Sequence, residues 1–421
     1  MTETNSPVSE SARGGERLDP ARLRGLIATN VGASVAFAAM YSTQPVLPQI
    51  GQDFHVGAAT AGLTLLAVTF ALAFASPAAG RLSDRFDMRR VMLICSGALT
   101  MLSALAAIAP TFALLVAVRA AQGLVIPGIS VTGLAYLHND LPASWRGRVS
   151  GFYIGANTLG GLVGRLGVGL LVSAITWRGG MAVIAGVVAL GTLILVVGMP
   201  RSAPGSRWHM RRDAPRADPS LRVIAARLWW APLIGAVVFF PFITIFTYTP
   251  YRLEGPPFRL PPSTANLFYL VYLLGAVAAL SAGNISDRIG RRTTIYLGLA
   301  LCALGLALCL VDLLPVALLA LALVCMGGLS SHVVANASVS DGANPLGAGA
   351  RATALSLYTM GFYIGGGLGA FIPGFGWEHW GWPGVVAPSA VAALCAAVVA
   401  LKTPRRHGQA AESSIEPVAA S

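Results

Sequence analysis

Twelve apolar segments recur along the 421-residue chain, each followed by a short polar stretch. About 20 consecutive apolar residues in a helix suffice to cross the hydrocarbon core of a bilayer. A membrane barrel would instead show shorter segments that alternate between apolar and polar residues, and that alternation is missing here. The sequence therefore predicts an all-α polytopic membrane protein with twelve transmembrane helices. We expect these helices to begin near Leu26, Ala58, Val91, Thr111, Val149, Trp177, Leu228, Thr264, Thr293, Pro315, Ala352 and Pro383.

The composition and the placement of charge support this class. The chain is 55% hydrophobic and 11% charged, which leaves too little polar surface to cover a soluble particle. If successive loops alternate between two sides, one side holds 24 of the 29 Lys and Arg residues, whereas the other holds Arg178, Arg252 and Arg259. The positive-inside rule then places both termini in the cytoplasm. The net charge of +12 thus indicates topology in a lipid bilayer and not a nucleic-acid partner.

A charged decapeptide occurs twice, at residues 80–89 and 283–292, each time between two apolar segments. Glycine, serine, an Asp-Arg pair and a later arginine coincide at an offset of 203 residues. Such a repeat indicates a duplicated chain. We predict two six-helix bundles at 26–199 and 228–402, joined by a cytoplasmic linker at 200–227 that is rich in proline and arginine. Residues 1–25 and 403–421 are predicted to be cytoplasmic tails, the second of them disordered.

The second copy of the decapeptide resembles the loop signature of the major facilitator superfamily of secondary transporters, Gly-x-x-x-Asp-Arg-x-Gly-Arg-Arg. It is complete at Gly283, Asp287, Arg288, Gly290, Arg291 and Arg292, and the first copy retains Gly80, Asp84, Arg85 and Arg89. Arg119, Gln122 and Gly123 match a second signature of that family, Arg-x-x-Gln-Gly. The Tyr-Ser-Thr-Gln-Pro run that begins at Tyr41, together with the length, is similar to bacterial twelve-span exporters of the drug-efflux type.

The resemblance implies two pseudo-symmetric bundles that rock against each other in the inner membrane of a bacterium. It also implies a monomer with a small-molecule substrate, the proton as coupling ion, and no other cofactor. In the loop signature, Gly80 and Gly283 would permit close helix approach. Gly290 supplies a turn residue that tolerates positive φ, and Asp87 is the second-best substitute in the first copy. Two interpretations of Asp84 and Asp287 stay open: a latch between the halves in the outward-facing state, or a local helix cap beside topological charge.

The fifth apolar segment carries Gly160, Gly161, Gly164 and Arg165 where similar exporters carry a Gly-Pro-x-x-Gly-Gly run. Glycines at this spacing give a smooth helix face that packs tightly or pivots against a neighbour. The proline has become glycine and the last glycine has become Arg165, which weakens the inference of an antiporter.

All 17 acidic residues lie in tails, loops or helix ends. A strictly cationic substrate is therefore disfavoured, because a buried cation needs a carboxylate partner. Two arginines do enter the membrane, and Arg119 lies nine residues past Pro110, roughly 13 Å along a helix. Arg119 and Arg165 either bind carbonyls and snorkel outward, or serve the substrate cavity and coupling. The second interpretation favours a neutral or anionic substrate.

Polar residues inside the apolar segments complete the candidate site. By the resemblance, the first, fourth, seventh and tenth helices line the cavity, which places Tyr41, Gln44, Gln122, Tyr248, His332 and Asn336 there. Asn157 is a further candidate, and Asn266, Tyr269 and Tyr272 would add to the wall. His332 would titrate near physiological pH if it is free, or it serves as a hydrogen-bonded interhelical residue.

The sequence favours a proton-coupled secondary transporter that exports small organic molecules by alternating access. The alternatives are uptake of an organic anion by the same fold and a non-transporting membrane receptor. An enzyme is not expected, because the chain lacks HExxH, CxxC and phosphate-loop sequences. The five cysteines lie in apolar segments, so we expect core packing and neither a disulfide nor a metal site.

Overall fold

The computed structural model describes residues 19–141, 145–200, 226–346 and 348–403. The predicted linker and tails fall largely outside these ranges, and the side chain of Asp84 is likewise outside the described residues. The described chain is helical throughout, in agreement with the predicted class.

The elements of the first half begin with α1 (Pro20–Tyr41), a 3-10 turn η1 (Gln44–Val46) and the short α2 (Leu47–Phe54). They continue with α3 (Ala58–Arg85), α4 (Met88–Ala107), α5 (Phe112–Asp140) and α6 (Arg146–Gly198). The second half comprises α8 (Trp230–Glu254), α9 (Pro262–Ala265), η3 (Asn266–Val271), α10 (Tyr272–Ile289), α11 (Arg291–Leu308), α12 (Leu314–Ala343), η4 (Asn344–Leu346), α13 (Ala348–Trp380), α14 (Trp382–Val399) and η5 (Ala400–Lys402). The first helix thus begins six residues before the predicted start at Leu26.

Eleven helical stretches of the described chain are long and apolar enough to cross a membrane. One of them, α6, is 53 residues long and would measure roughly 80 Å if it were straight. Its backbone leaves the helical region at Ile175 and Thr176, where Thr176 has φ 63°. The two arms, 146–175 and 177–198, then both pack on α1: Gly164 lies against Ala38 and Gly191 against Val35. The prediction of twelve membrane passes is therefore confirmed, with two of them in α6.

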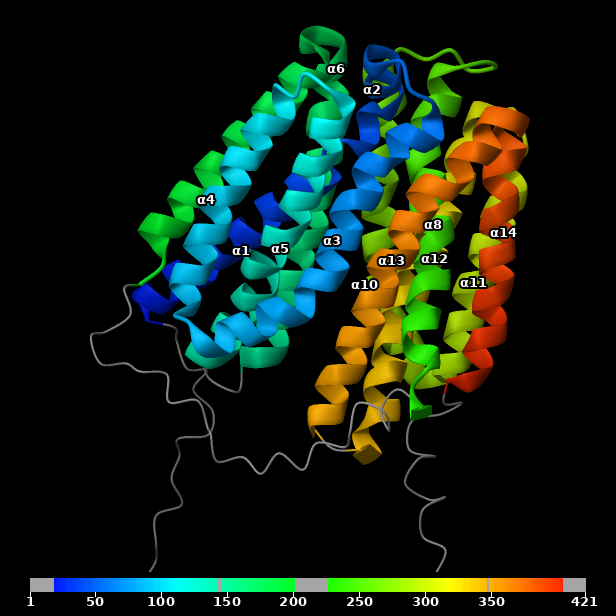
Figure 1. The fold of residues 1–421 in the computed structure, drawn as a ribbon. Coiled ribbons are helices and arrows are strands. Elements are labelled where there is room, and N and C mark those ends of the chain that lie inside the picture. The colour runs from blue at the N-terminus through cyan, green and yellow to red at the C-terminus, as the bar shows by residue number, and fades with distance from the viewer. Residues whose placement is uncertain (1–18, 142–144, 201–225, 347, 404–421) are drawn as a thin grey trace, which may run out of the picture.

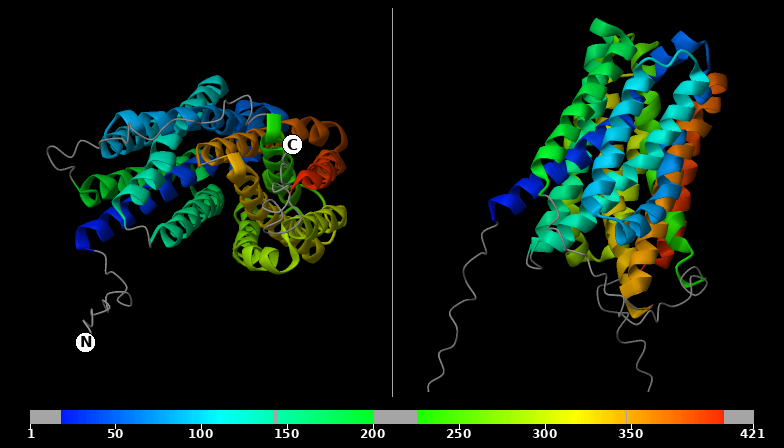
Figure 2. Two further views of the ribbon diagram at one scale, coloured as in Figure 1. Left: turned by 90° about the horizontal axis from the view of Figure 1, so that it is seen from below. Right: turned by 60° about the vertical axis from the view of Figure 1, so that its left-hand side comes forward.

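The two halves form two helical bundles that lie side by side and pack together at one end (Figures 1 and 2). We name the end that holds the loops between α3 and α4 and between α10 and α11 the arginine-rich end, and the end that holds α2 the opposite end. Figure 1 shows the bundles converging toward the opposite end and diverging toward the arginine-rich end.

Glycines set the contact between the first and fifth helix of each half. A Cβ added at Gly160 or Gly164 of α6 would collide with the carbonyl oxygens of Ser34 and Ala38 in α1. In the second half, Gly361 and Gly365 of α13 approach the carbonyls of Pro232 and Ala236 in α8 in the same way. Both contacts use glycines four residues apart, which is the spacing that lets helix backbones approach closely in membranes.

The halves are joined at the opposite end by side chains of both. Gln49 Nε2 donates to Glu254 Oε2 at 2.8 Å, and the backbone N–H of Ala59 donates to Glu378 Oε1 at 2.9 Å. Ala59 lies in the first turn of α3, so the carboxylate of Glu378 caps a helix N-terminus in the other half. Backbone contact between α3 and α13 continues inward, where Gly62 meets Ala370.

At the arginine-rich end, the signature residues make contacts inside each half. Arg89 Nε donates to the carbonyl of Met199 at 3.3 Å, and its counterpart Arg292 donates to that of Thr403 at 3.0 Å. Each arginine thus binds the last turn of the sixth helix of its own half, where the helix dipole favours a cation. Asp341 forms an ion pair with Arg291 at 2.5 Å in the second half.

The glycines and turns of the signature behave unequally. Gly290 has φ 89°, as predicted for the tight turn. The expectation for Asp87 is wrong, because its φ is −59° and its carboxylate instead caps α4 by accepting from the N–H of Arg90 at 3.2 Å. An added Cβ at Gly80 or Gly283 would meet nothing within 4 Å, so the predicted close approach is not made in this conformation. Arg85 and Arg288 are exposed.

Replacing Gly164 by alanine should destabilise the first half by about 1–3 kcal/mol. The new Cβ would collide with backbone atoms of Ala38, and no flexible side chain can move to relieve that collision. The midpoint of thermal unfolding in detergent should fall. Gly155→Ala, on the same arm of α6, is the matched control, because its Cβ would meet nothing within 4 Å. Equal midpoints for the two variants would contradict the close contact with α1.

Removing the carboxylate of Glu378 should open the opposite end, since α3 loses its partner across the halves. Spin labels at Gln52 and Trp380, both exposed, should report a longer-distance population by double electron–electron resonance in Glu378→Ala. Asp312→Ala is the control, because Asp312 pairs at 2.9 Å with Arg252 inside the second half. An unchanged distance distribution in Glu378→Ala would refute the bridge.

Candidate functional site

The site begins with an interruption in α1. The helix ends at Tyr41, and the chain passes through η1 before helical structure resumes at Leu47. Pro45 and Pro48 favour the interruption, because neither has an N–H to donate to the carbonyl four residues earlier. Since α1 ends at Tyr41, the carbonyls of its last turn, including those of Ala39 and Met40, also lack their usual intrahelical donors, and inside a membrane they need others.

Arg119 supplies those donors. Its side chain is fully buried, and its Nη1 donates to the carbonyl of Ala39 at 2.8 Å while Nη2 donates to that of Met40. Nε donates to the carbonyl of Thr64 in α3 at 3.2 Å. Gln122 accepts from Nη1 at 2.7 Å and donates to Ser103 at 3.1 Å. Arg119 and Gln122 thus form a closed polar network inside the first half, of the carbonyl-binding kind considered above.

Arg165 has a different environment. It is 2% exposed, and Nε donates to Gln44 Oε1 at 2.6 Å. The guanidinium lies over the ring of Tyr41 at 3.7 Å and over that of Tyr272, from the second half, at 4.7 Å. Gly161 makes room for it, since an added Cβ there would lie 3.0 Å from Nη1. Among the described residues, no carboxylate oxygen lies within ion-pair distance of Arg165.

Gln44 joins Arg165 to the second half. Its Nε2 donates to Thr247 Oγ1 of α8 at 2.8 Å, so the chain Arg165–Gln44–Thr247 crosses between the bundles. Gln44 follows the first helix of the first half and Thr247 lies in α8, the first helix of the second half, so the bond joins the corresponding helices of the two halves. Asn266 adds a second link by donating to the carbonyl of Pro45 at 3.3 Å.

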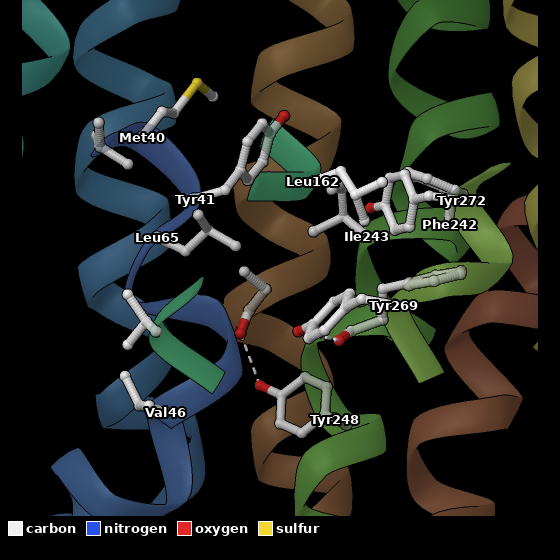
Figure 3. Close-up of a cluster of buried hydrophobic side chains, with 14 of the residues drawn as sticks. Met40, Tyr41, Val46, Leu65, Leu162, Phe242, Ile243, Tyr248, Tyr269 and Tyr272 are labelled. Atoms are coloured by element: carbon white, nitrogen blue, oxygen red, sulfur yellow. Dashed lines mark hydrogen bonds between the residues drawn. The ribbon is translucent and has the colours of Figure 1, made fainter. Parts of the chain in front are cut away.

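Aromatic rings of the second half cover the other side of this centre. Figure 3 shows Tyr269 and Tyr272 directed toward the half that carries Tyr41. Tyr272 packs edge-on against Phe242 and Phe246, with centroid distances of 5.4 and 4.8 Å. The cation is therefore held among π faces, which attract it electrostatically.

The structure brings together only some of the predicted residues. Tyr41, Gln44 and Arg165 meet between the halves, and Tyr269 and Tyr272 form the expected wall. Tyr248 instead donates to the carbonyl of Ala370 at 2.6 Å inside the second half.

The remaining polar candidates lie nearer the arginine-rich end. His332 Nδ1 is 2.7 Å from the hydroxyl of Tyr358, and its ring packs on Phe362 at 4.2 Å. Asn336 follows one turn later on α12 and is half-buried. Asn157 lies two turns before Arg165 on α6, and its buried Oδ1 has no hydrogen-bond partner among the described residues.

Three contributions to the site and its support were not predicted. Thr247 was noticed only as part of a repeated motif, and nothing in the sequence marks it as the partner of Gln44. The stack of Phe242 and Phe246 on Tyr272 leaves no signal in an apolar segment, where phenylalanine is ordinary. Gly361 and Gly365 could have been found from the Gly-x-x-x-Gly spacing that they share with Gly160 and Gly164.

The two buried arginines should differ in their effect on folding. Arg119→Gln should lower the midpoint of thermal unfolding strongly, because the buried carbonyl of Met40 loses the donor that Arg119 supplies, and a buried acceptor without a donor costs about 1–3 kcal/mol. Arg165→Gln should lower it less, since its guanidinium bonds to side chains and to no backbone carbonyl among the described residues. Both variants carry the same chemical change and are measured in the same detergent. A larger loss for Arg165→Gln would contradict the role assigned to Arg119.

Comparison with known proteins agrees with this architecture. The chain is similar to the inner membrane transport protein YnfM of Escherichia coli, with 28% identity over 398 residues and 93% of each chain covered. It is 27% identical over 354 residues to an uncharacterized MFS-type transporter, YybF, of Bacillus subtilis, covering 83% of this chain and 86% of that one.

Solved structures give the same fold. A D-xylose–proton symporter superposes with a TM-score of 0.71 at 15% identity, covering 91% of this chain and 98% of that one. A bacterial homologue of the human lysosomal transporter Spinster, in an inward-facing and occupied conformation, gives 0.68 at 16% identity, with 92% and 95% covered. The family model described as Major Facilitator Superfamily matches residues 29–262 and 257–420. The chain therefore belongs to the Major Facilitator Superfamily of membrane transporters.

Proposed function

We propose that this protein is a proton-coupled secondary transporter that exports small neutral or anionic organic molecules across the bacterial inner membrane by alternating access. It acts as a monomer with both termini in the cytoplasm, so the arginine-rich end faces the cytoplasm. The similarity to drug-efflux-type exporters supports export as the direction of net transport.

The observation that carries the proposal is the placement of the contacts between the halves. Three of the contacts that join the bundles lie toward the opposite end. They are Glu378 with the first turn of α3, Gln49 with Glu254, and Gly62 with Ala370. At the arginine-rich end, Gly80 and Gly283 have open space around them. A transporter that closes at one end and separates at the other is poised to load from the side where it is separated.

The central contacts fit such a cycle. Gln44, Thr247 and Arg165 lie where the closed region meets the separated region, so they change partners whenever the halves rock. Binding a molecule there can favour one arrangement of the halves only if the molecule contacts both of them, and this centre presents groups from both.

Purified protein in proteoliposomes should catalyse counterflow of its substrate without any gradient, because exchange needs only alternating access. Concentrative flux should require a proton gradient and should collapse when a protonophore is added, while counterflow persists. Everted membrane vesicles with an acidified lumen should accumulate the substrate, since export is directed into that lumen. Concentrative flux that survives the protonophore would disprove proton coupling, and accumulation only in right-side-out vesicles would establish uptake.

A further inference from the structure

Arg165 is a buried cation that has no carboxylate oxygen within ion-pair distance among the described residues. Arg119 donates from all three of its guanidinium nitrogens, mostly to backbone carbonyls. Arg165, by contrast, donates from Nε to Gln44 and interacts with the hydroxyl of Tyr41. A guanidinium offers five N–H donors in a planar fork, so these two contacts leave donors for a further acceptor.

An unpartnered hydroxyl belongs to a ring that lies beside Arg165. Tyr272 is 4% exposed, and its hydroxyl has no hydrogen-bond partner among the described residues. The guanidinium of Arg165 lies 4.7 Å from the centroid of its ring. A buried hydroxyl without a partner costs free energy, which a bound acceptor would recover. Arg165 and Tyr272 come from different halves, so an acceptor between them would contact both.

We propose that Arg165 and Tyr272 bind the carboxylate of a monoanionic organic acid, and that this acid is the class of substrate the protein transports. The statement that this acid is transported rests on the proposed function, whereas the binding of the carboxylate does not. The remaining donors of the guanidinium suit a carboxylate, which binds arginine through charge-assisted hydrogen bonds. A monoanion leaves the pair neutral, whereas a dianion would bury an uncompensated charge.

The shape of the rest of the molecule follows from the aromatic rings. From Tyr272 a chain of ring contacts runs through Phe242 at 5.4 Å and Phe239 at a further 5.5 Å. Phe239 stacks on Phe362 at 3.5 Å, and Phe362 contacts His332 at 4.2 Å toward the arginine-rich end. These rings offer an apolar surface beside the anion-binding edge. We therefore assign the site to an aromatic or otherwise apolar monocarboxylate.

Equilibrium binding to the purified full-length protein in nanodiscs tests the assignment with three matched probes. They are 3-phenylpropionate, its neutral amide, and the cationic 3-phenylpropylamine, titrated calorimetrically at neutral pH. The carboxylate should bind, and the other two should bind at least tenfold more weakly. Arg165→Gln should weaken carboxylate binding about 10- to 150-fold, which corresponds to the loss of a charge-assisted hydrogen bond. Arg178→Gln, which alters an arginine paired with Asp53 at 2.9 Å near the opposite end, should leave binding unchanged.

A second variant keeps the test decisive if Arg165→Gln does not fold. Tyr272→Phe removes only a hydroxyl that bonds to no described residue, so it should keep its unfolding midpoint while weakening carboxylate binding. Unchanged binding in Tyr272→Phe, tighter binding of the amide or the amine, or no binding of the carboxylate would overturn the assignment.

Failure of this inference can be separated from failure of the proposed function. Counterflow of neutral or cationic compounds without carboxylate binding would reject the site and keep the transporter. Binding that depends on Arg165, with no counterflow of the bound acid, would keep the site and reject its role in transport.

Discussion

The requirement that every backbone polar group inside a membrane be bonded governs the centre of this protein. The first helix ends at Tyr41, shortly before Pro45 and Pro48, and the guanidinium of Arg119 donates to two carbonyls of its last turn, those of Ala39 and Met40. The same break takes Gln44 out of a regular helix and lets it reach both Arg165 and Thr247. A buried arginine with no ion-pair partner among the described residues thus supports the backbone that makes the contact between the halves.

The second half lacks the break in its first helix. At the repeat offset of 205 residues, Pro250 corresponds to Pro45, but Leu253 stands where the first half has Pro48, and α8 continues unbroken to Glu254. At an offset of 203, Ala322 of α12 occupies the position equivalent to Arg119. The broken helix and its arginine are therefore present together in one half and absent together in the other. Duplication supplied two similar bundles, and divergence made one of them polar and the other aromatic.

Much of the fold is predictable from the sequence because it rests on local properties. Apolar length locates the twelve passes, the repeat divides them into two halves, and Gly290 marks a turn that needs positive φ. The partners of polar groups are not local. The sequence near Arg119 does not predict that its acceptors lie in α1 and α3. The sequence near Arg165 does not predict its contact with Tyr272, which is 107 residues away. Prediction also fails at short range for Asp87. A turn with positive φ was expected there, but Asp87 has negative φ and caps the N-terminus of α4.

The charge of the site bears on the direction of transport. Moving one elementary charge through 100 mV changes its free energy by about 2.3 kcal/mol, a concentration ratio of roughly 50-fold. In a cell whose interior is negative, that potential drives a monoanion outward and opposes its entry. A proton moving inward in exchange adds to the same driving force, because both steps carry positive charge inward. Uptake of the same anion would need at least one accompanying cation only to cancel the potential. A centre that binds a monoanion is therefore better suited to export than to uptake.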